Sequence, residues 1–270
     1  MVHQADIIKK LKIIKKPFIQ IYDSATITDF DIVFVRLPNV TYKDFITLKP
    51  NKKQNFECSE LHLICSVIRE LSSKLKKTSK LLIMGESFLL PYIRNYISKE
   101  FSFHNWFAVR INKDDIDGPF LKNEHIGVLL LTKETNKLEH NTVRIAYEYC
   151  DYCKKTTKDY GGKKHLYHSF GTSMSDVWKD ITISREDEFP SVIIERFQDL
   201  FSINSNKKML LTSLWNLKKN DYKKMISNKI IPKEIFSAGK TKIKKTKMIP
   251  KNKLLLGDCI KQLEKIKDES

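Results

Sequence analysis

Short apolar runs alternate with helical segments along most of this chain, and the alternation restricts the possible folds more than any other feature. The runs at 31–38 and 80–85 end in a proline and a glycine, which predicts two buried strands. Residues 59–77 place their apolar side chains on one helical face, with Ser59 as the expected N-cap. Residues 88–101 predict a second helix.

Further strands are expected at 104–111, 125–133 and 207–215, and a further helix at 190–202. Strands that alternate with helices predict an α/β fold with a mostly parallel sheet. A chain of 270 residues can bury the core of one large domain or two small ones. No apolar run approaches the roughly 18–20 residues that cross a bilayer, so we expect no membrane partner.

Lysine is concentrated near the end of the chain. The formal net charge is +17, which indicates a polyanionic partner such as nucleic acid. The stretch Lys207–Lys253 holds 15 lysines against two acidic residues. Within it, residues 239–253 predict an exposed linker or arm. Its lysines are either merely solvated or contact DNA phosphates; the candidate contacts are Lys240, Lys242, Lys244 and Lys245.

The number and placement of the five cysteines argue against a disulfide framework. Cys58, Cys65 and Cys259 are scattered in apolar segments, and an odd count is unusual for a secreted, cross-linked domain. The basic N-terminus also lacks the apolar core of a signal peptide. We therefore expect a reducing compartment and a cytoplasmic location.

The other two cysteines belong to a candidate metal site. Cys150 and Cys153 are followed, after eleven residues, by His165 and His168. Two thiolates and two imidazoles form the ligand set of a closed tetrahedral zinc site, which leaves no position for a catalytic water. The zinc would be structural, because the loop is too polar to bury a core of its own. The alternative is two free thiols with two surface histidines.

The loop between these pairs is rich in lysine. If metal holds the loop rigid, its lysines form a fixed basic surface that suits a phosphate backbone. If it does not, they are ordinary solvated charges. The candidate DNA contacts are Lys154, Lys155, Lys158, Lys163 and Lys164.

Several motifs lie in a fixed order around this loop. The CxxC and HxxH pairs, a Tyr-Gly-Gly-Lys-Lys-His core and a Ser-Asp-Val-Trp tail are followed by Phe-Pro-x3-Ile-Glu-Arg, all within 147–196. With the strand that begins at Asp31–Phe34, this order resembles that of the DNA amino-methyltransferases in the circularly permuted arrangement, with the catalytic half first. These enzymes methylate the exocyclic amine of adenine or cytosine. The resemblance covers 25–217, and outside 147–196 it is only a similarity of pattern.

The resemblance implies a Rossmann-like methyltransferase sheet into which a small zinc-binding loop region is inserted. It also implies that a second, truncated methyltransferase-like domain begins near the end of the chain; the alternative there is an ordinary strand and helix. The expected divisions are a basic N-terminal segment (1–24), a degenerate methyltransferase-like domain (25–217) with its recognition region at about 147–182, a lysine-rich linker (218–252), and the start of the second domain (253–270).

The chain departs from the family at both chemical centres. Aligning Asp31–Phe34 with the catalytic strand puts Arg36 where the family has an acidic or amide residue that holds the target amine. Leu37 and Pro38 then stand at the positions of its two prolines, and Asn39 stands at the position of its aromatic residue. The expected donor-binding strand, 209–216, contains neither a glycine nor an acid. We therefore predict no catalytic residues in this chain, and no donor-binding residue can be named.

Three functions remain open from the sequence. The chain is a non-catalytic half of a site-specific DNA methyltransferase of the restriction-modification type, which binds double-stranded DNA and positions an active half or subunit. Alternatively, it is an active enzyme with diverged motifs, or a zinc-stabilised nucleic-acid-binding module unrelated to methylation. S-adenosylmethionine is expected as a cofactor only if the active interpretation or an intact second copy holds.

Overall fold

The main element of the fold is a seven-stranded sheet. The computed structural model describes residues 12–15, 30–48, 60–112, 122–133, 138–156, 164–201 and 208–215. The strands of the sheet, from one edge to the other, are β1 (Lys12–Lys15), β11 (Lys208–Ser213), β2 (Ile32–Arg36), β3 (Lys80–Glu86), β5 (His125–Thr132), β4 (Ser102–Ile111) and β10 (Val177–Ile183).

All neighbouring strands pair in parallel except β5, which is antiparallel to both β3 and β4. The prediction of a mostly parallel α/β sheet is therefore confirmed. The five strands predicted from the sequence are all present, within a few residues of their predicted ends.

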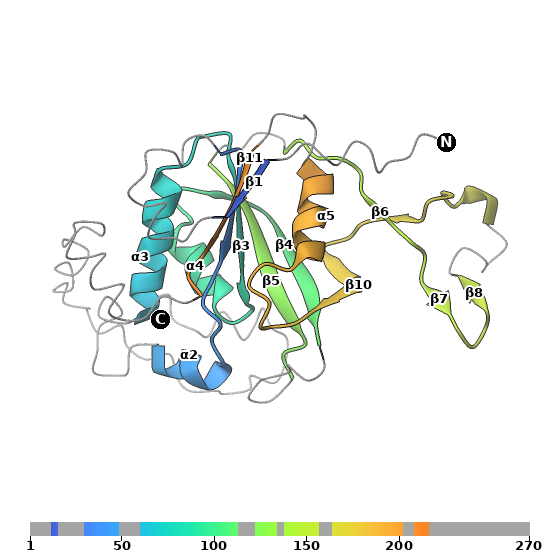
Figure 1. The fold of residues 1–270 in the computed structure, drawn as a ribbon, viewed down its shortest axis with the longest axis horizontal. Coiled ribbons are helices and arrows are strands. Elements are labelled where there is room, and N and C mark those ends of the chain that lie inside the picture. Colours follow the sequence, from blue (N-terminus) through green and yellow to red (C-terminus); the bar gives the residue numbers. More distant parts are fainter. Residues whose placement is uncertain are drawn as a thin grey trace, which may run out of the picture. The chain divides into compact units, whose positions relative to one another are not determined.

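Helices cover both faces of the sheet. Figure 1 shows α3 (Glu60–Ser73) and α4 (Leu90–Tyr96) on one face and α5 (Ser191–Phe201) on the other. A short helix, α2 (Tyr42–Leu48), follows β2, and the backbone amide of Asp44 donates to the hydroxyl of Thr41 at its start. Pro91 lies in the first turn of α4, as predicted.

Alternate side chains of the central strands divide the core between the two faces. Ile32 and Phe34 point toward α5, where the ring centroids of Phe34 and Phe197 are 6.3 Å apart. Val33 and Val35 are equally buried, and by the alternation along the strand they point to the opposite face. Strands buried on both sides explain why the sequence shows continuous apolar runs there instead of alternation.

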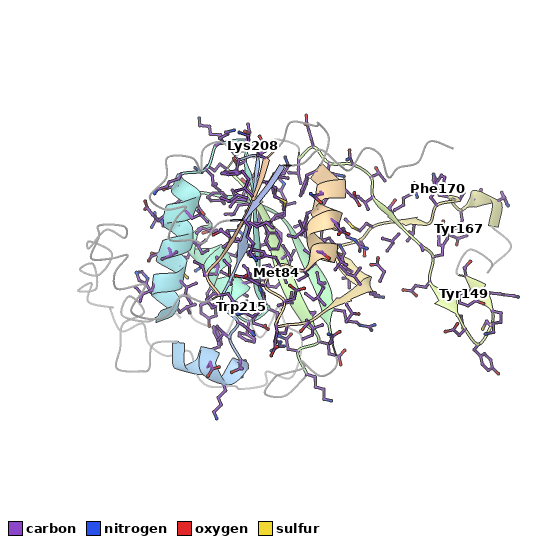
Figure 2. All side chains as sticks on the ribbon, in the orientation of Figure 1. Met84, Tyr149, Tyr167, Phe170, Lys208 and Trp215 are labelled. Carbon is purple, nitrogen blue, oxygen red and sulfur yellow. The ribbon has the colours of Figure 1, made fainter. Side chains whose placement is uncertain are left out.

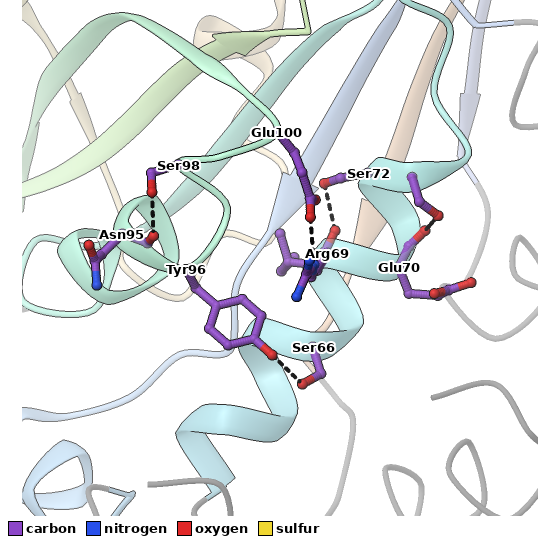
Figure 3. A network of polar contacts seen from close by, with 10 residues as sticks. Ser66, Arg69, Glu70, Ser72, Asn95, Tyr96, Ser98 and Glu100 are labelled. Atoms are coloured by element: carbon purple, nitrogen blue, oxygen red, sulfur yellow. Dashed lines mark hydrogen bonds and ion pairs between the residues drawn. The ribbon is translucent and has the colours of Figure 1, made fainter. Parts of the chain in front are cut away.

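Side chains also link α3 to α4 and the turn that follows it, as Figure 3 shows. The hydroxyls of Ser66 and Tyr96 share a hydrogen bond of 3.2 Å. Arg69 Nε donates to Glu100 Oε1 at 2.6 Å. The Arg69–Glu100 pair connects α3 to the turn after α4; it is partly exposed and therefore contributes little stability.

Helices α3 and α4 are shorter than predicted. Helix α3 ends at Ser73, where the hydroxyls of Ser72 and Ser73 donate to main-chain carbonyls of the preceding turn. Helix α4 ends at Tyr96, five residues before the predicted end. Ser59 lies outside the described residues, so its capping role stays a prediction.

Two strands of the sheet were not predicted. The segment 1–24 was expected to be a basic extension, yet Lys12–Lys15 forms β1 and pairs with β11. Strand β10 contains Trp178, which is buried in the core beside Phe107, with ring centroids 5.1 Å apart. Among the described residues, no helix is long and apolar enough to cross a membrane.

Candidate functional site

The carboxyl ends of β2 and β11 form the position where an open α/β sheet usually binds its ligand. The two strands are parallel neighbours, with Ser213 opposite Arg36. The chain leaves β2 toward α3 on one face, whereas β11 is reached from α5 on the other face. Ligands bind at such reversals of strand order, beyond the carboxyl ends of the strands.

Arg36 occupies this position and is completely buried. Its Nη2 donates to the main-chain oxygen of Arg185 at 3.1 Å, and its guanidinium carbon lies 4.5 Å from the ring centroid of Trp215. Within the described residues, its Nε and Nη1 have no hydrogen-bond partner. Burial lowers the pKa of Arg36 to about 10, and the nearby carboxylate of Glu86 opposes that shift.

A buried ion pair lies beside Arg36 at the ends of neighbouring elements. Glu86, the last residue of β3, is completely buried, and its Oε1 is 3.6 Å from Arg185 Nε. Asn123 Nδ2 donates to the other oxygen of Glu86 at 3.2 Å, and Arg185 Nη2 donates to the Asn123 main-chain oxygen at 3.4 Å. Because Glu86 interacts with these groups, its carboxylate is not presented to solvent as a catalytic base.

Leu37, the residue after Arg36, packs over Gly85 of the neighbouring strand β3. Its side chain is buried, and its amide donates to the main-chain oxygen of Met84 at 2.8 Å. A Cβ added at Gly85 would lie 2.6 Å from Leu37 Cδ1, so only glycine leaves room for this packing. Pro38 is half-buried and Asn39 is exposed. The four positions aligned with the family's catalytic motif therefore present no carboxylate and no aromatic ring.

Side chains also cover the carboxyl end of β11. Leu214 is buried and its amide donates to the Arg36 main-chain oxygen at 2.8 Å. Trp215 follows directly and covers the guanidinium of Arg36; Figure 2 labels it near Met84. No glycine occurs between 208 and 215. The segment therefore lacks the glycine that would let a backbone approach a ligand most closely.

Sequence reasoning identified Arg36 at this site but missed Glu86, Asn123, Arg185 and Trp215. Glu86 follows the predicted strand 80–85 directly, and an acid at the end of a buried strand is a signal that could have been used. Arg185 lies 149 residues from Arg36, and no local pattern connects the two.

The inserted region forms two small two-stranded sheets of its own. One pairs β6 (Arg144–Ile145) with β9 (Thr172–Ser173), and the other pairs β7 (Tyr149–Cys150) with β8 (Lys155–Thr156). Cys150 and Cys153 are both exposed at the β7–β8 turn, which Lys154 completes with a φ of 52°. The amide of Cys153 donates to Cys150 Sγ at 3.4 Å, and this contact lowers the pKa of the Cys150 thiol.

The two histidines lie in and after a short 3-10 helix, η7 (Lys164–Leu166). The main-chain oxygen of His168 accepts a hydrogen bond from the Tyr147 hydroxyl at 2.9 Å. The ring Nδ1 of His168 accepts a hydrogen bond from the Phe170 amide at 3.2 Å. In the part of the chain that the structure describes, no three His, Cys, Asp or Glu side chains are placed to hold a metal. The structure thus does not bring the four proposed zinc ligands together, and the zinc site stays a prediction.

The proposed DNA-contacting lysines are only partly described. Lys154 and Lys155 are exposed on the β7–β8 hairpin. Lys164 begins η7. The remaining candidates lie outside the described residues: Lys158, Lys163, Lys240, Lys242, Lys244 and Lys245. The linker 218–252 and the segment 253–270 lie outside them as well.

Comparison with known proteins relates the sequence to DNA methyltransferases. No protein-family model matches the chain. Over 121 residues it is 25% identical to the type II methyltransferase M.BamHI of Bacillus amyloliquefaciens. The match covers 43% of this chain but only 29% of M.BamHI, so the chain spans less than a third of that relative.

Solved structures give a looser likeness. A Thermus thermophilus protein described as a DNA modification methylase, TTHA0409, has 12% identity and a TM-score of 0.42, over 82% of this chain and 96% of its own. M1.HpyAVI, solved with S-adenosylmethionine, has 8% identity and a TM-score of 0.40, over 82% of this chain and 99% of its own. At these values the superpositions support no residue-level argument.

Proposed function

We propose that this chain is a non-catalytic relative of the DNA methyltransferases, which binds double-stranded DNA as the target-recognition half of a site-specific adenine or cytosine amino-methyltransferase. Such a protein belongs with restriction-modification systems, and it needs an active half or subunit for methyl transfer. The similarity to M.BamHI supports the relationship to DNA methyltransferases. The loss of catalysis rests on one observation: the packing of Arg36.

Arg36 cannot do the chemistry required at the end of β2. Methylation of an exocyclic amine needs a hydrogen-bond acceptor for the amine and room for a base that has left the DNA stack. A guanidinium has donors only. Here it is completely buried, with its guanidinium carbon 4.5 Å from the ring centroid of Trp215. The end of β2 therefore offers a buried donor group where the reaction needs an acceptor.

DNA binding is supported by charge and by the inserted region. The net charge of +17 favours a polyanion, and exposed lysines lie on the β7–β8 hairpin. The relative M.BamHI is a type II methyltransferase, and DNA is the substrate of that enzyme class. A sheet that has lost its chemistry can still orient this hairpin against a duplex.

We further propose that zinc orders the inserted region. Cys150 and Cys153 already form a turn in which a main-chain amide donates to a sulfur, an arrangement that favours the thiolate that zinc requires. His165 and His168 follow within the same insertion. Binding would have to draw the histidine segment toward the cysteine turn, so the metal is expected to reduce the motion of the whole insertion.

Two measurements on the full chain test the proposed function. Isothermal titration calorimetry with S-adenosylmethionine should give no binding at micromolar donor, and plasmid DNA incubated with the chain and tritiated donor should stay unlabelled. Fluorescence anisotropy should show binding to duplex DNA. Micromolar donor binding, or methyl transfer that Arg36→Asp changes, would instead support an active enzyme. Absence of DNA binding would remove the recognition role.

A further inference from the structure

Exposed hydrophobic side chains are concentrated in the inserted region. The described part of the chain has eight large hydrophobic side chains that are exposed, and five of them lie between 149 and 170. The other three are spread over β4, β10 and α5. Single exposed hydrophobic side chains are common, so the concentration of five in one inserted segment is the feature to explain. The five are Tyr149, Tyr152, Leu166, Tyr167 and Phe170.

Tyr152 is the most exposed of the five, at 96%, and it lies at the turn of the β7–β8 hairpin between the two cysteines. Tyr149, labelled in Figure 2 on β7, is 56% exposed. Folding gains almost nothing from Tyr152, since its ring remains in water. A large aromatic ring at a hairpin turn therefore has its energetic value in binding.

Other aromatic side chains in the insertion are held in place. The rings of Tyr147 and Tyr167 meet edge to face with centroids 5.8 Å apart. The Tyr147 hydroxyl also donates to the His168 main-chain oxygen at 2.9 Å. These contacts join the segment before the hairpin to the segment after η7. Tyr152 is thus a free ring on a region that has internal contacts of its own.

The charges around Tyr152 favour nucleic acid as the partner. Lys154 and Lys155 are exposed immediately after the turn. Between 150 and 168 the sequence has five lysines and two acidic residues. Aromatic rings that stack on bases, beside cations that contact phosphates, are the combination used to bind nucleic acids. Lysine is depleted from the cores of protein–protein interfaces, which makes a protein partner a poorer match.

We propose that Tyr152 stacks on a base of the bound DNA, while Lys154 and Lys155 contact the adjacent phosphates. The inference rests on the proposed DNA-binding function and adds to it a specific recognition residue. Stacking requires an accessible base face, so the contact should be strongest at an unstacked base, such as a single-nucleotide bulge, and weaker on a fully paired duplex.

The experiment compares Tyr152→Ala with Tyr152→Phe, and both with the double variant Lys154→Ala/Lys155→Ala. Affinity for a bulged and a fully paired duplex is measured by fluorescence anisotropy at several salt concentrations. Tyr152→Ala should weaken binding to the bulged duplex by roughly 5- to 150-fold with an unchanged salt slope. Tyr152→Phe should bind like the wild type. The lysine variant should instead lower the salt slope by about 0.9 for each phosphate that is no longer neutralised.

The outcomes separate this inference from the proposed function. If the wild type binds neither duplex, the proposed function fails. If the wild type binds and Tyr152→Ala binds equally well, only the stacking role fails. Sedimentation velocity covers the alternative of a protein interface, because a change in self-association without a change in DNA affinity would overturn the inference. Quenching of 2-aminopurine in the bulge by the wild type, but not by Tyr152→Ala, would support stacking directly.

Discussion

The guanidinium of Arg36 is stacked beneath the ring of Trp215, at 4.5 Å from the ring centroid. Arg36 is the last residue of β2, and Trp215 lies two residues after the end of the adjacent parallel strand β11. The amide of Leu214 donates to the Arg36 main-chain oxygen. Cation–π contacts of this kind contribute about 2 kcal/mol when they are desolvated. The stacking joins the end of β2 to the segment that follows β11, at the candidate site.

The first prediction concerns the buried charges at this position. Changing Glu86→Gln removes the carboxylate beside two buried arginines, and one uncompensated buried charge costs about 3–5 kcal/mol. We expect urea unfolding to show a loss of stability in that range. The control is Glu186→Gln, because Glu186 is exposed. This variant should change the free energy of unfolding by no more than about 0.5 kcal/mol. A small effect at Glu86 would mean that its carboxylate does not balance the arginines.

The second prediction is that removing the charge of Arg36, unlike removing that of Glu86, does not destabilise the protein. Two of its nitrogens have no hydrogen-bond partner in the described structure, and burial lowers its pKa to about 10, so the charged form is penalised by folding. Arg36→Met removes the charge and keeps an unbranched apolar chain about as long as the arginine up to its Nε. Replacing a buried charge by a packed apolar group is often neutral or stabilising by about 1–4 kcal/mol. Urea unfolding should therefore show no loss of stability for this variant.

The double variant Arg36→Met/Glu86→Gln gives a second test. Of the three buried charged residues Arg36, Glu86 and Arg185, only Arg185 remains charged in it, so part of the stability lost by Glu86→Gln alone should return. A strongly destabilised Arg36→Met single variant would indicate that the Trp215 stacking outweighs the cost of burying the guanidinium.

The pattern of apolar runs was sufficient to predict the buried strands, because β2, β3, β5 and β11 are covered on both faces and need continuous apolar sequence. It failed for β1 and β10. Strand β1 has only four residues, two of them lysines, and reads as part of a basic segment. Strand β10 has a mixed burial pattern, so its sequence contains no long apolar run.

The candidate site was predictable only in part. The alignment with the family's catalytic strand gave the position of Arg36 at the end of β2, because strand order along the chain is visible in the sequence. Its partners were not predictable, since Arg185 and Trp215 reach it through tertiary contacts. For the proposed zinc ligands, the sequence spacing indicates a metal site. The spacing does not determine whether the cysteine segment and the histidine segment come together in the fold.

The third prediction tests the pair that anchors β10 to α5. Both guanidinium NH2 groups of Arg196 donate to the Asp180 carboxylate, one of them at 2.9 Å, and these hydrogen bonds lower the pKa of Asp180. Because the pKa of Asp180 is lower in the folded protein than its unfolded value of 3.8, the Asp180 carboxylate stabilises the folded state at pH values above 3.8. This stabilisation is lost as the pH falls through the lower pKa of the folded protein.

Asp180→Asn should therefore reduce stability at pH 7 by about 0.5–1 kcal/mol, a modest figure because the pair is partly exposed. The difference from the wild type should vanish at pH values below the folded pKa. Asp176→Asn, at an exposed residue just before β10, is the matched control. Thermal unfolding from pH 2 to 7 measures all three proteins, and a difference that persists in acid would contradict an electrostatic origin.

The fourth prediction concerns zinc. Protein purified without chelator should contain about one zinc per chain, and a chelator should increase hydrogen exchange within 144–173 before the seven-stranded sheet is affected. Cys150→Ser should abolish the metal content, whereas Cys65→Ser should not, because Cys65 is buried in α3. Metal-free wild-type protein with unchanged hydrogen exchange would exclude the zinc site.

The last prediction assigns DNA affinity and DNA selectivity to different parts of the chain. The segment 239–253 is rich in lysine, and such a segment can neutralise phosphates without reading bases. Deleting it should weaken binding to all duplexes alike and lower the salt slope by about 0.9 for each phosphate that the segment neutralises.

Replacing both Cys150 and Cys153 by serine should instead reduce the preference among DNA sequences, because the hairpin lysines would no longer be held in a fixed position. Most of the salt-dependent affinity should remain. Salt titrations of both variants on several duplexes distinguish the two effects. A deletion that leaves both affinity and salt slope unchanged would show that the segment is only a linker, and the inference from net charge to DNA would then rest on the hairpin alone.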